Sequence, residues 1–133
     1  GFPGTTLVGA AHHLRIFDPI RPSLLHRLPA RLIRYFFQEL LLAGACYGQF
    51  LPPLGFGAAS ARQGKYYDFL GINYYTRDIV QFQLNPGAMF GQLSVPPEAP
   101  TNDLGWEIYP EGLGRLIRHY HRLYPGPIYI TEN

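Results

Sequence analysis

The sequence predicts an α/β fold in which helices cover a parallel sheet. Three short segments have the length and residue types of buried strands, at residues 5–14, 68–75 and 128–132. Two longer segments with apolar residues at helical spacing separate them, at residues 23–43 and 110–124. Because strands that alternate with helices pair in parallel through right-handed crossovers, this order predicts a β/α repeat.

The first predicted strand, residues 5–14, carries no charge and is followed by a break at Pro19 and Pro22. The first predicted helix, residues 23–43, has the apolar stripe of an amphipathic helix. The stripe expected to face the core consists of Leu25, Leu28, Leu32, Ile33, Phe36, Phe37, Leu40 and Leu41. Pro29 either starts or kinks this helix, and Gly44 is expected to end it.

The second predicted strand, residues 68–75, becomes polar toward its C-terminal end. Its side chains alternate between two faces. One face carries Leu70, Ile72 and Tyr74, and the other carries Phe69, Gly71, Asn73 and Tyr75. The first set is the face that a helix layer would cover. Because ligands bind at the C-terminal ends of parallel strands, Asn73 and Tyr75 are candidate site residues. The alternative is that Tyr75 packs with its hydroxyl reaching water.

The last two elements follow a long stretch, residues 77–105, that is predicted to be irregular and is rich in proline and glycine. The second helix starts at Pro110, and Glu111 favours the positive end of its dipole. Its predicted inner stripe is Leu113, Leu116, Ile117, Tyr120 and Leu123. In the last strand, Ile128, Ile130 and Glu132 are expected to share one face. The Glu132 carboxylate lies at the C-terminal end of this strand. It either takes part in a reaction or is simply a charge exposed to solvent.

Composition narrows the possible functions. The chain has 133 residues, 47% of them hydrophobic and 15% charged, which predicts one globular domain with a core. A net charge of +2 gives no reason to expect binding to nucleic acid or to a membrane. Cys46 is the only cysteine, so no disulfide within the chain and no cysteine zinc site are possible. The histidine spacings match no helical metal motif, so no metal site is expected.

Three motifs occur in order and together resemble a known family. They are DFLGINYYT at residues 68–76, GWEIYPEGL at residues 105–113 and YITEN at residues 129–133. They resemble the sixth strand, sixth helix and seventh strand of glycoside hydrolase family one, which contains β-glucosidases and β-galactosidases. LVGAAHHLRIFDP, at residues 7–19, looks like the fifth strand of that family.

The resemblance implies a fold and a domain organisation. It implies that the chain is a fragment of a (β/α)8 TIM barrel, covering about strands five to seven with two intervening helices. Residues 1–133 are then one partial glycoside hydrolase domain that lacks the N-terminal strands and the final strand. A whole barrel of this kind takes about 250 residues.

The resemblance also implies retaining hydrolysis of a terminal β-D-glucoside or related β-glycoside, or of an oligosaccharide, with no cofactor. The position of Glu132 matches the family nucleophile, and that of Tyr75 matches a tyrosine that hydrogen-bonds it. Asn73 matches an asparagine near the two catalytic carboxylates. Trp106 resembles a residue on the aglycone side of the cleft, although a lone tryptophan can also simply anchor a loop.

One expected part is missing from the sequence. The family acid/base glutamate lies in an Asn-Glu-Pro motif, which this chain does not contain. The chain alone is therefore predicted to be inactive, as part of a longer enzyme. The alternative is a non-catalytic carbohydrate-binding module or a degenerate remnant of the fold. Localisation and oligomeric state are left open, although the lone cysteine favours the cytoplasm over a disulfide-stabilised secreted scaffold.

Overall fold

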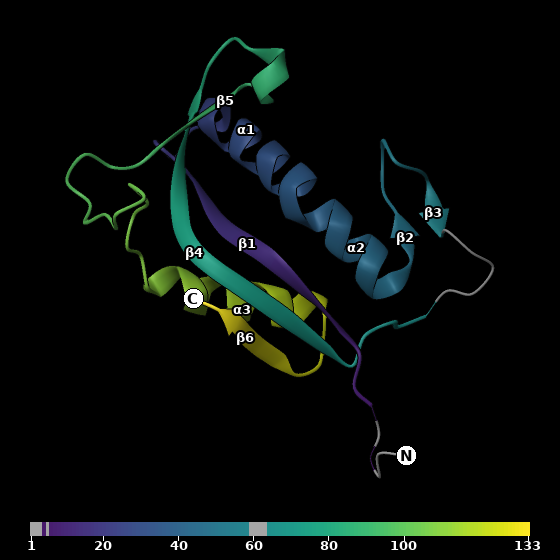
Figure 1. Ribbon diagram of the computed structural model, residues 1–133. Helices are drawn as coiled ribbons and strands as arrows, with labels where there is room; N and C mark the ends of the chain where they lie inside the picture. Colours follow the sequence, from purple (N-terminus) through teal and green to yellow (C-terminus); the bar gives the residue numbers. More distant parts are fainter. Residues whose placement is uncertain (1–3, 5, 59–63) are drawn as a thin grey trace.

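The computed structural model describes residue 4, residues 6–58 and residues 64–133, which form a curved sheet with helices on one face (Figure 1). The strands of this sheet are β1 (Gly9–Pro19), β4 (Phe69–Phe82), β5 (Gly91–Ser94) and β6 (Ile128–Glu132). The helical elements are α1 (Leu24–Arg34), the π-helix η1 (Tyr35–Glu39), α2 (Leu40–Tyr47), the 3-10 helix η2 (Pro86–Ala88) and α3 (Glu111–Leu123). A separate two-stranded ribbon consists of β2 (Gln49–Phe50) and β3 (Gly57–Ala58).

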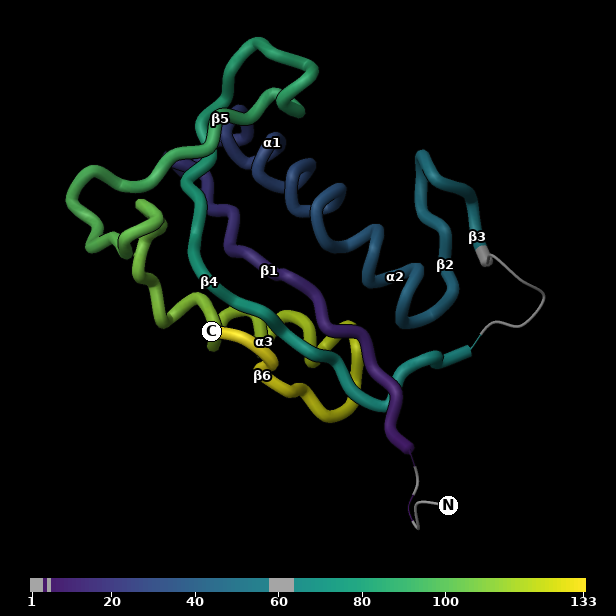
Figure 2. The backbone as a smooth tube through the Cα atoms, in the orientation of Figure 1, coloured from purple at the N-terminus to yellow at the C-terminus, as the bar shows by residue number. Residues whose placement is uncertain are grey.

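The long strand β4 lies at the centre of the sheet (Figure 2). It pairs in parallel with β1 along one edge, from Phe69 to Val80. The other edge is divided between two shorter strands. The N-terminal half of β4 pairs in parallel with β6, and its C-terminal end pairs antiparallel with β5. The predicted parallel sheet is therefore confirmed, with an antiparallel strand added to it.

Both long strands differ from their predicted bounds. The first begins at Gly9 and continues to Pro19, whereas the prediction was residues 5–14, of which Thr5 lies outside the described residues. The strand β4 extends to Phe82, so the start of the stretch predicted to be irregular is sheet. The extension depends on tertiary contacts, because pairing with β1 and β5 supplies hydrogen-bond partners for the backbone groups of residues 77–82.

The first helical segment runs without interruption from Leu24 to Tyr47, with Pro29 inside it. It ends at Gly48, whose φ of 63° is the left-handed conformation typical of a residue that terminates a helix. The predicted end at Gly44 is therefore wrong. The amide of Gly48 instead donates to the carbonyl of Gly44 in the last turn.

The predicted inner stripe of this helix is wrong in part. Ile33 and Leu40 are buried, but Leu28 is 63% exposed, and Leu25, Leu41, Phe36 and Phe37 are exposed too. The residues that face the core also include Ala30, Gln38, Leu42, Ala43 and Cys46. A π-helical hydrogen bond spans one residue more than an α-helical one, so η1 rotates the residues after it relative to a regular 3.6-residue spacing. Leu25 and Leu28 precede η1, so their exposure has a different origin.

The core lies between the sheet and the helices. Leu70, Ile72 and Tyr74 of β4 are buried there, as predicted for the helix-covered face. The helix α3 contributes Leu116 and Tyr120, with Leu113 and Ile117 packed at the margin. Leu123, predicted to face inward, is instead exposed, because Tyr124 takes the next place in the core.

Within the described residues, no helix combines the length and the apolar character needed to cross a membrane.

Candidate active site

The structure brings Glu132 and Tyr75 together at the C-terminal ends of β6 and β4. The Tyr75 hydroxyl donates a hydrogen bond to Oε2 of Glu132. Glu132 is exposed, whereas Tyr75 is half-buried. Because parallel strands place their C-terminal ends at one edge of the sheet, two side chains from distant parts of the sequence meet here.

An irregularity in β6 decides on which face Glu132 lies. Ile130 pairs with Ile72, but Asn73 then pairs with Glu132, so Thr131 is an extra residue in β6. Paired residues share a face of a parallel sheet, and Ile72 faces the helices. The prediction that Glu132 shares a face with Ile128 and Ile130 is therefore wrong, because the register shift moves it to the face of Asn73.

The other two predicted site residues lie close by. The side-chain oxygen of Asn73 accepts a hydrogen bond from the Thr131 hydroxyl. The indole of Trp106 is tilted against the ring of Tyr75, with 5.8 Å between the ring centroids. Tyr75 thus contacts both Glu132 and Trp106, and Asn73 pairs in register with Glu132, so the structure brings all four predicted site residues together.

Two residues of β1 that the sequence reasoning missed also belong to this group. His13 pairs in register with Asn73, and its ring meets that of Tyr75 edge-on, at 4.8 Å and 80°. The Arg15 guanidinium lies over the Trp106 ring, 5.1 Å from its centroid. The signal was present, because the first strand also becomes polar toward its C-terminal end, in the sequence AAHHLR.

Burial, together with nearby charges, favours the neutral form of His13. Burial lowers the pKa of His13, as do the Arg15 charge and the neighbouring His12, and they outweigh the Glu132 carboxylate, which raises it. Nε2 of His13 accepts a hydrogen bond from Nε of Arg15 at 3.3 Å. Only a nitrogen without a proton can accept, so the ring carries its proton on Nδ1.

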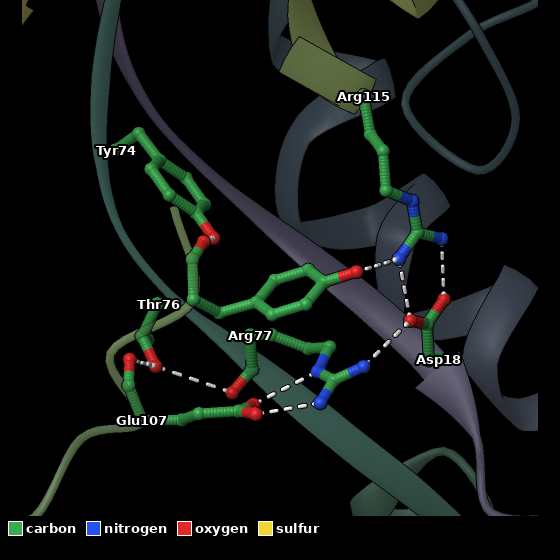
Figure 3. Close-up of polar contacts among 7 residues, drawn as sticks. Asp18, Tyr74, Thr76, Arg77, Glu107 and Arg115 are labelled. Carbon is green, nitrogen blue, oxygen red and sulfur yellow. Dashed lines mark hydrogen bonds and ion pairs between the residues drawn. The ribbon is translucent and has the colours of Figure 1, made fainter. Parts of the chain in front are cut away.

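A polar network that includes Arg115 of α3 anchors the segment that contains Trp106 (Figure 3). Asp18 accepts two hydrogen bonds from Arg115, at 2.6 and 2.7 Å, and its Oδ2 lies 3.5 Å from Arg77. Arg77 in turn donates to both oxygens of Glu107, at 2.8 and 2.5 Å. The Tyr109 ring lies against the Arg77 guanidinium, 3.9 Å from its centroid.

Backbone contacts complete this anchoring. Thr76 donates its hydroxyl to the carbonyl of Glu107 at 3.0 Å, and Tyr74 donates to the carbonyl of Tyr109 at 2.5 Å (Figure 3). The side chain of Asn102 accepts from the backbone amide of Trp106 at 3.0 Å. Trp106 is therefore held on both sides of its position in the chain, which gives its indole a fixed place beside Tyr75.

The network also shifts the ionisation of its members. Burial opposes the ionised form of Asp18, but hydrogen bonds and charges from Arg115 and Arg77 outweigh it and lower the pKa of Asp18. The hydrogen bonds that Arg77 donates to Glu107 raise the pKa of Arg77. These groups are charged and mutually neutralised, so they hold the fold and are unsuited to proton transfer near neutral pH.

The arrangement suits chemistry on a polar ligand with a flat face. It offers an exposed carboxylate with a phenol hydroxyl as donor, an amide close to it, and an indole at one side. Aromatic faces stack on the apolar faces of ligand rings, while hydroxyl, amide and carboxylate groups fix their polar edges.

Comparisons with known proteins agree with this reading. A sequence profile of glycosyl hydrolase family 1 matches residues 58–133. A β-galactosidase of Pyrococcus woesei is 35% identical over 82 residues, covering 50% of this chain and 16% of the relative. β-Glucosidase A of Thermotoga maritima is 39% identical over 67 residues, covering 50% of this chain and 15% of the relative. The chain thus spans only about a sixth of the length of these curated relatives.

Solved structures confirm the fold. A β-glucosidase of Exiguobacterium marinum superposes with a TM-score of 0.79 at 25% identity, over 97% of this chain and 32% of its own. A β-glycosidase of Pyrococcus horikoshii gives 0.74 at 25% identity, over 94% and 29%. The sheet and its helices are thus part of a (β/α)8 barrel, as the sequence predicted. With its profile matched over more than half of the residues, the chain belongs to glycosyl hydrolase family 1.

Proposed function

We propose that this chain is part of a retaining β-glycosidase in which Glu132 is the nucleophile. The observation that carries the proposal is the hydrogen bond from Tyr75 to an exposed Glu132 at the C-terminal ends of parallel strands. Barrel enzymes have their active sites at that end. Family membership supplies the reaction class, and the relatives are named β-galactosidase and β-glucosidase.

In the proposed first step, the Glu132 carboxylate attacks the anomeric carbon of a terminal β-glycoside and the aglycone leaves. A covalent glycosyl-enzyme forms, and water then hydrolyses it with net retention of configuration. Tyr75 donates to Oε2, which stabilises the ionised carboxylate and leaves Oε1 to attack. Asn73 supports the same strand end, and Trp106 offers its face to the aglycone.

The proposed reaction needs a second carboxylate, roughly 5–5.5 Å from the first, to act as acid and then as base. The chain contains no Asn-Glu-Pro, and Asp18, Asp78 and Glu107 are each paired with arginine. We therefore propose that the acid/base lies outside these 133 residues. The chain is then a partial barrel domain that is inactive alone.

The test uses the complete polypeptide, meaning the longest product that the native transcript encodes across these residues. It is assayed with aryl β-glucosides and β-galactosides, and then treated with a 2-deoxy-2-fluoro glycoside that slows hydrolysis of the intermediate. We expect one sugar per protein, mapped by mass spectrometry to the peptide that contains Glu132. Labelling at another residue, or full turnover by Glu132→Gln, contradicts the proposal.

A second function has one observation in its favour. The Tyr75 and Trp106 rings form an aromatic wall that can bind a sugar without the missing acid/base. If the complete polypeptide binds glucosides in a calorimetric titration but does not cleave them, it is a carbohydrate-binding descendant. If it does neither, the chain is a degenerate remnant of the fold.

A further inference from the structure

Four side chains beside Glu132 contact one another in a closed ring, which we call the Arg15 ring: Arg15, His13, Tyr75 and Trp106. Arg15 donates to His13, and His13 meets Tyr75 edge-on. Tyr75 lies against Trp106, and Trp106 is covered by Arg15. Each member thus has two neighbours within the ring, and Tyr75 also reaches Glu132.

Arg15 is fixed from three sides. One of its terminal nitrogens lies 2.9 Å from Oδ2 of Asp78, in a pair whose side chains are only 16% and 11% exposed. Its Nε donates to His13, and its guanidinium lies over the Trp106 ring, 5.1 Å from the centroid. A planar guanidinium can satisfy all three neighbours at once, whereas a lysine ammonium cannot.

His13 contacts two aromatic rings edge-on. The Phe37 centroid lies 5.5 Å away at 82°, and the Tyr75 centroid lies 4.8 Å away at 80°. Its backbone is held by β-pairing opposite Asn73. The lowered pKa of His13 agrees with an unprotonated Nε2 that accepts from Arg15. The imidazole therefore has one orientation, and it limits where the Tyr75 ring can lie.

We propose that His13 and Arg15 are positioning residues for the nucleophile. His13 holds the Tyr75 ring so that its hydroxyl reaches Glu132, and Arg15 joins this pair to Trp106. The positions of the nucleophile Glu132 and of the Trp106 indole are then fixed together. This inference rests on the proposed function for its kinetic meaning, but its geometric claim concerns only the hydrogen bond between Tyr75 and Glu132.

The first test does not require turnover. The complete polypeptide is labelled with 13C at the ζ carbon of tyrosine, and Tyr75→Phe identifies the Tyr75 resonance. Glu132→Gln shows where that resonance lies once the charged acceptor is gone. We expect His13→Ala to move the resonance most of the way to that position. The matched control is His12→Ala, because His12 is adjacent but contacts Phe37 and not Tyr75. An unmoved resonance in His13→Ala overturns the proposal.

The second test is a double-mutant cycle on kcat/KM. We expect His13→Ala to lower kcat/KM about tenfold, mainly through kcat, since small misplacements of reacting groups cost large rate factors. In the Tyr75→Phe background the same substitution is expected to cost less than about twofold, because residues that act through one another are not additive. If the two losses multiply, His13 does not act through Tyr75 and the proposal is wrong.

The outcomes separate this inference from the proposed function. A polypeptide without turnover, in which His13→Ala still moves the Tyr75 resonance, contradicts the glycosidase and supports the positioning role. An active enzyme in which His13→Ala leaves the Tyr75 resonance unmoved, and in which the losses of kcat/KM multiply, supports the glycosidase and contradicts the positioning role. Arg15→Lys is a further test of the positioning role. It keeps the charge but loses the planar guanidinium that contacts His13 and Asp78 together.

Discussion

Two carboxylates near the same end of the sheet are treated in opposite ways. Glu107 is 4% exposed, and both of its oxygens accept from Arg77. Glu132 is exposed, accepts from the Tyr75 hydroxyl, and makes no ion pair within the described part of the chain. One carboxylate is paired with a guanidinium through both oxygens, and the other accepts from one neutral hydroxyl on a single oxygen.

The difference shows how a fold separates anchoring from chemistry. A buried charge costs much to remove from water and is stable only beside a matched partner, so the Glu107 side chain is held in place by Arg77. A nucleophile must keep an uncommitted lone pair, and a single neutral donor leaves Glu132 that freedom. The two roles therefore predict different losses when each partner is removed.

The largest effect is expected from Glu132→Gln. Removing the nucleophile should lower kcat of the complete polypeptide by about 10⁴-fold or more. Because Glu132 is exposed, urea unfolding should change by less than about 0.5 kcal/mol. Steady-state rates and denaturation curves measured on one preparation check both parts. A large loss of stability would assign Glu132 to the anchoring class instead.

Next comes Arg77→Met, which breaks the buried pair and leaves Glu107 without its partner. We expect a loss of about 3–5 kcal/mol in the free energy of unfolding. The matched control is Arg77→Met combined with Glu107→Leu, which removes both charges and should recover much of the stability. Urea denaturation measures all three variants. If the double variant is as unstable as the single one, packing and not charge holds the segment that contains Glu107.

Tyr75→Phe is expected to have a smaller effect, confined to the reaction. Loss of a hydrogen bond to a charged group costs about 1.5–3 kcal/mol, so kcat/KM should fall roughly 10- to 150-fold. The melting temperature should hardly move, because the aromatic ring remains. An unchanged kcat/KM would show that the hydroxyl does not serve the nucleophile.

The smallest effect concerns pH. The pKa of Asp18 is lower in the folded protein than its ordinary value of 3.8, so its ion pairs stabilise the fold above that value. That contribution is lost as the pH falls through the folded pKa. The stability difference between the wild type and Asp18→Asn should therefore shrink below about pH 4. Asp103→Asn, an exposed carboxylate outside the network, is the control and should show a smaller change.

Much of the fold and the site could be predicted from the sequence. The alternation of strands and helices predicted the parallel sheet, and the polar ends of the second and third strands pointed to Asn73, Tyr75 and Glu132. These features depend on local periodicity, which the chain carries at every position. The roles of these residues stay a proposal, but their proximity is a property of the structure.

Three features were decided only by tertiary contacts. The extra residue Thr131 sets the face of Glu132, the π-turn η1 sets which residues of α2 face the core, and β-pairing extends β4 to Phe82. None has a local signature, because each arises where one element is fitted to another. Arg15 shows the same rule, since one residue of the first strand meets Asp78 and Trp106 only once the sheet has formed. The sequence by itself determined which elements and polar residues are present, and packing decided which of them meet.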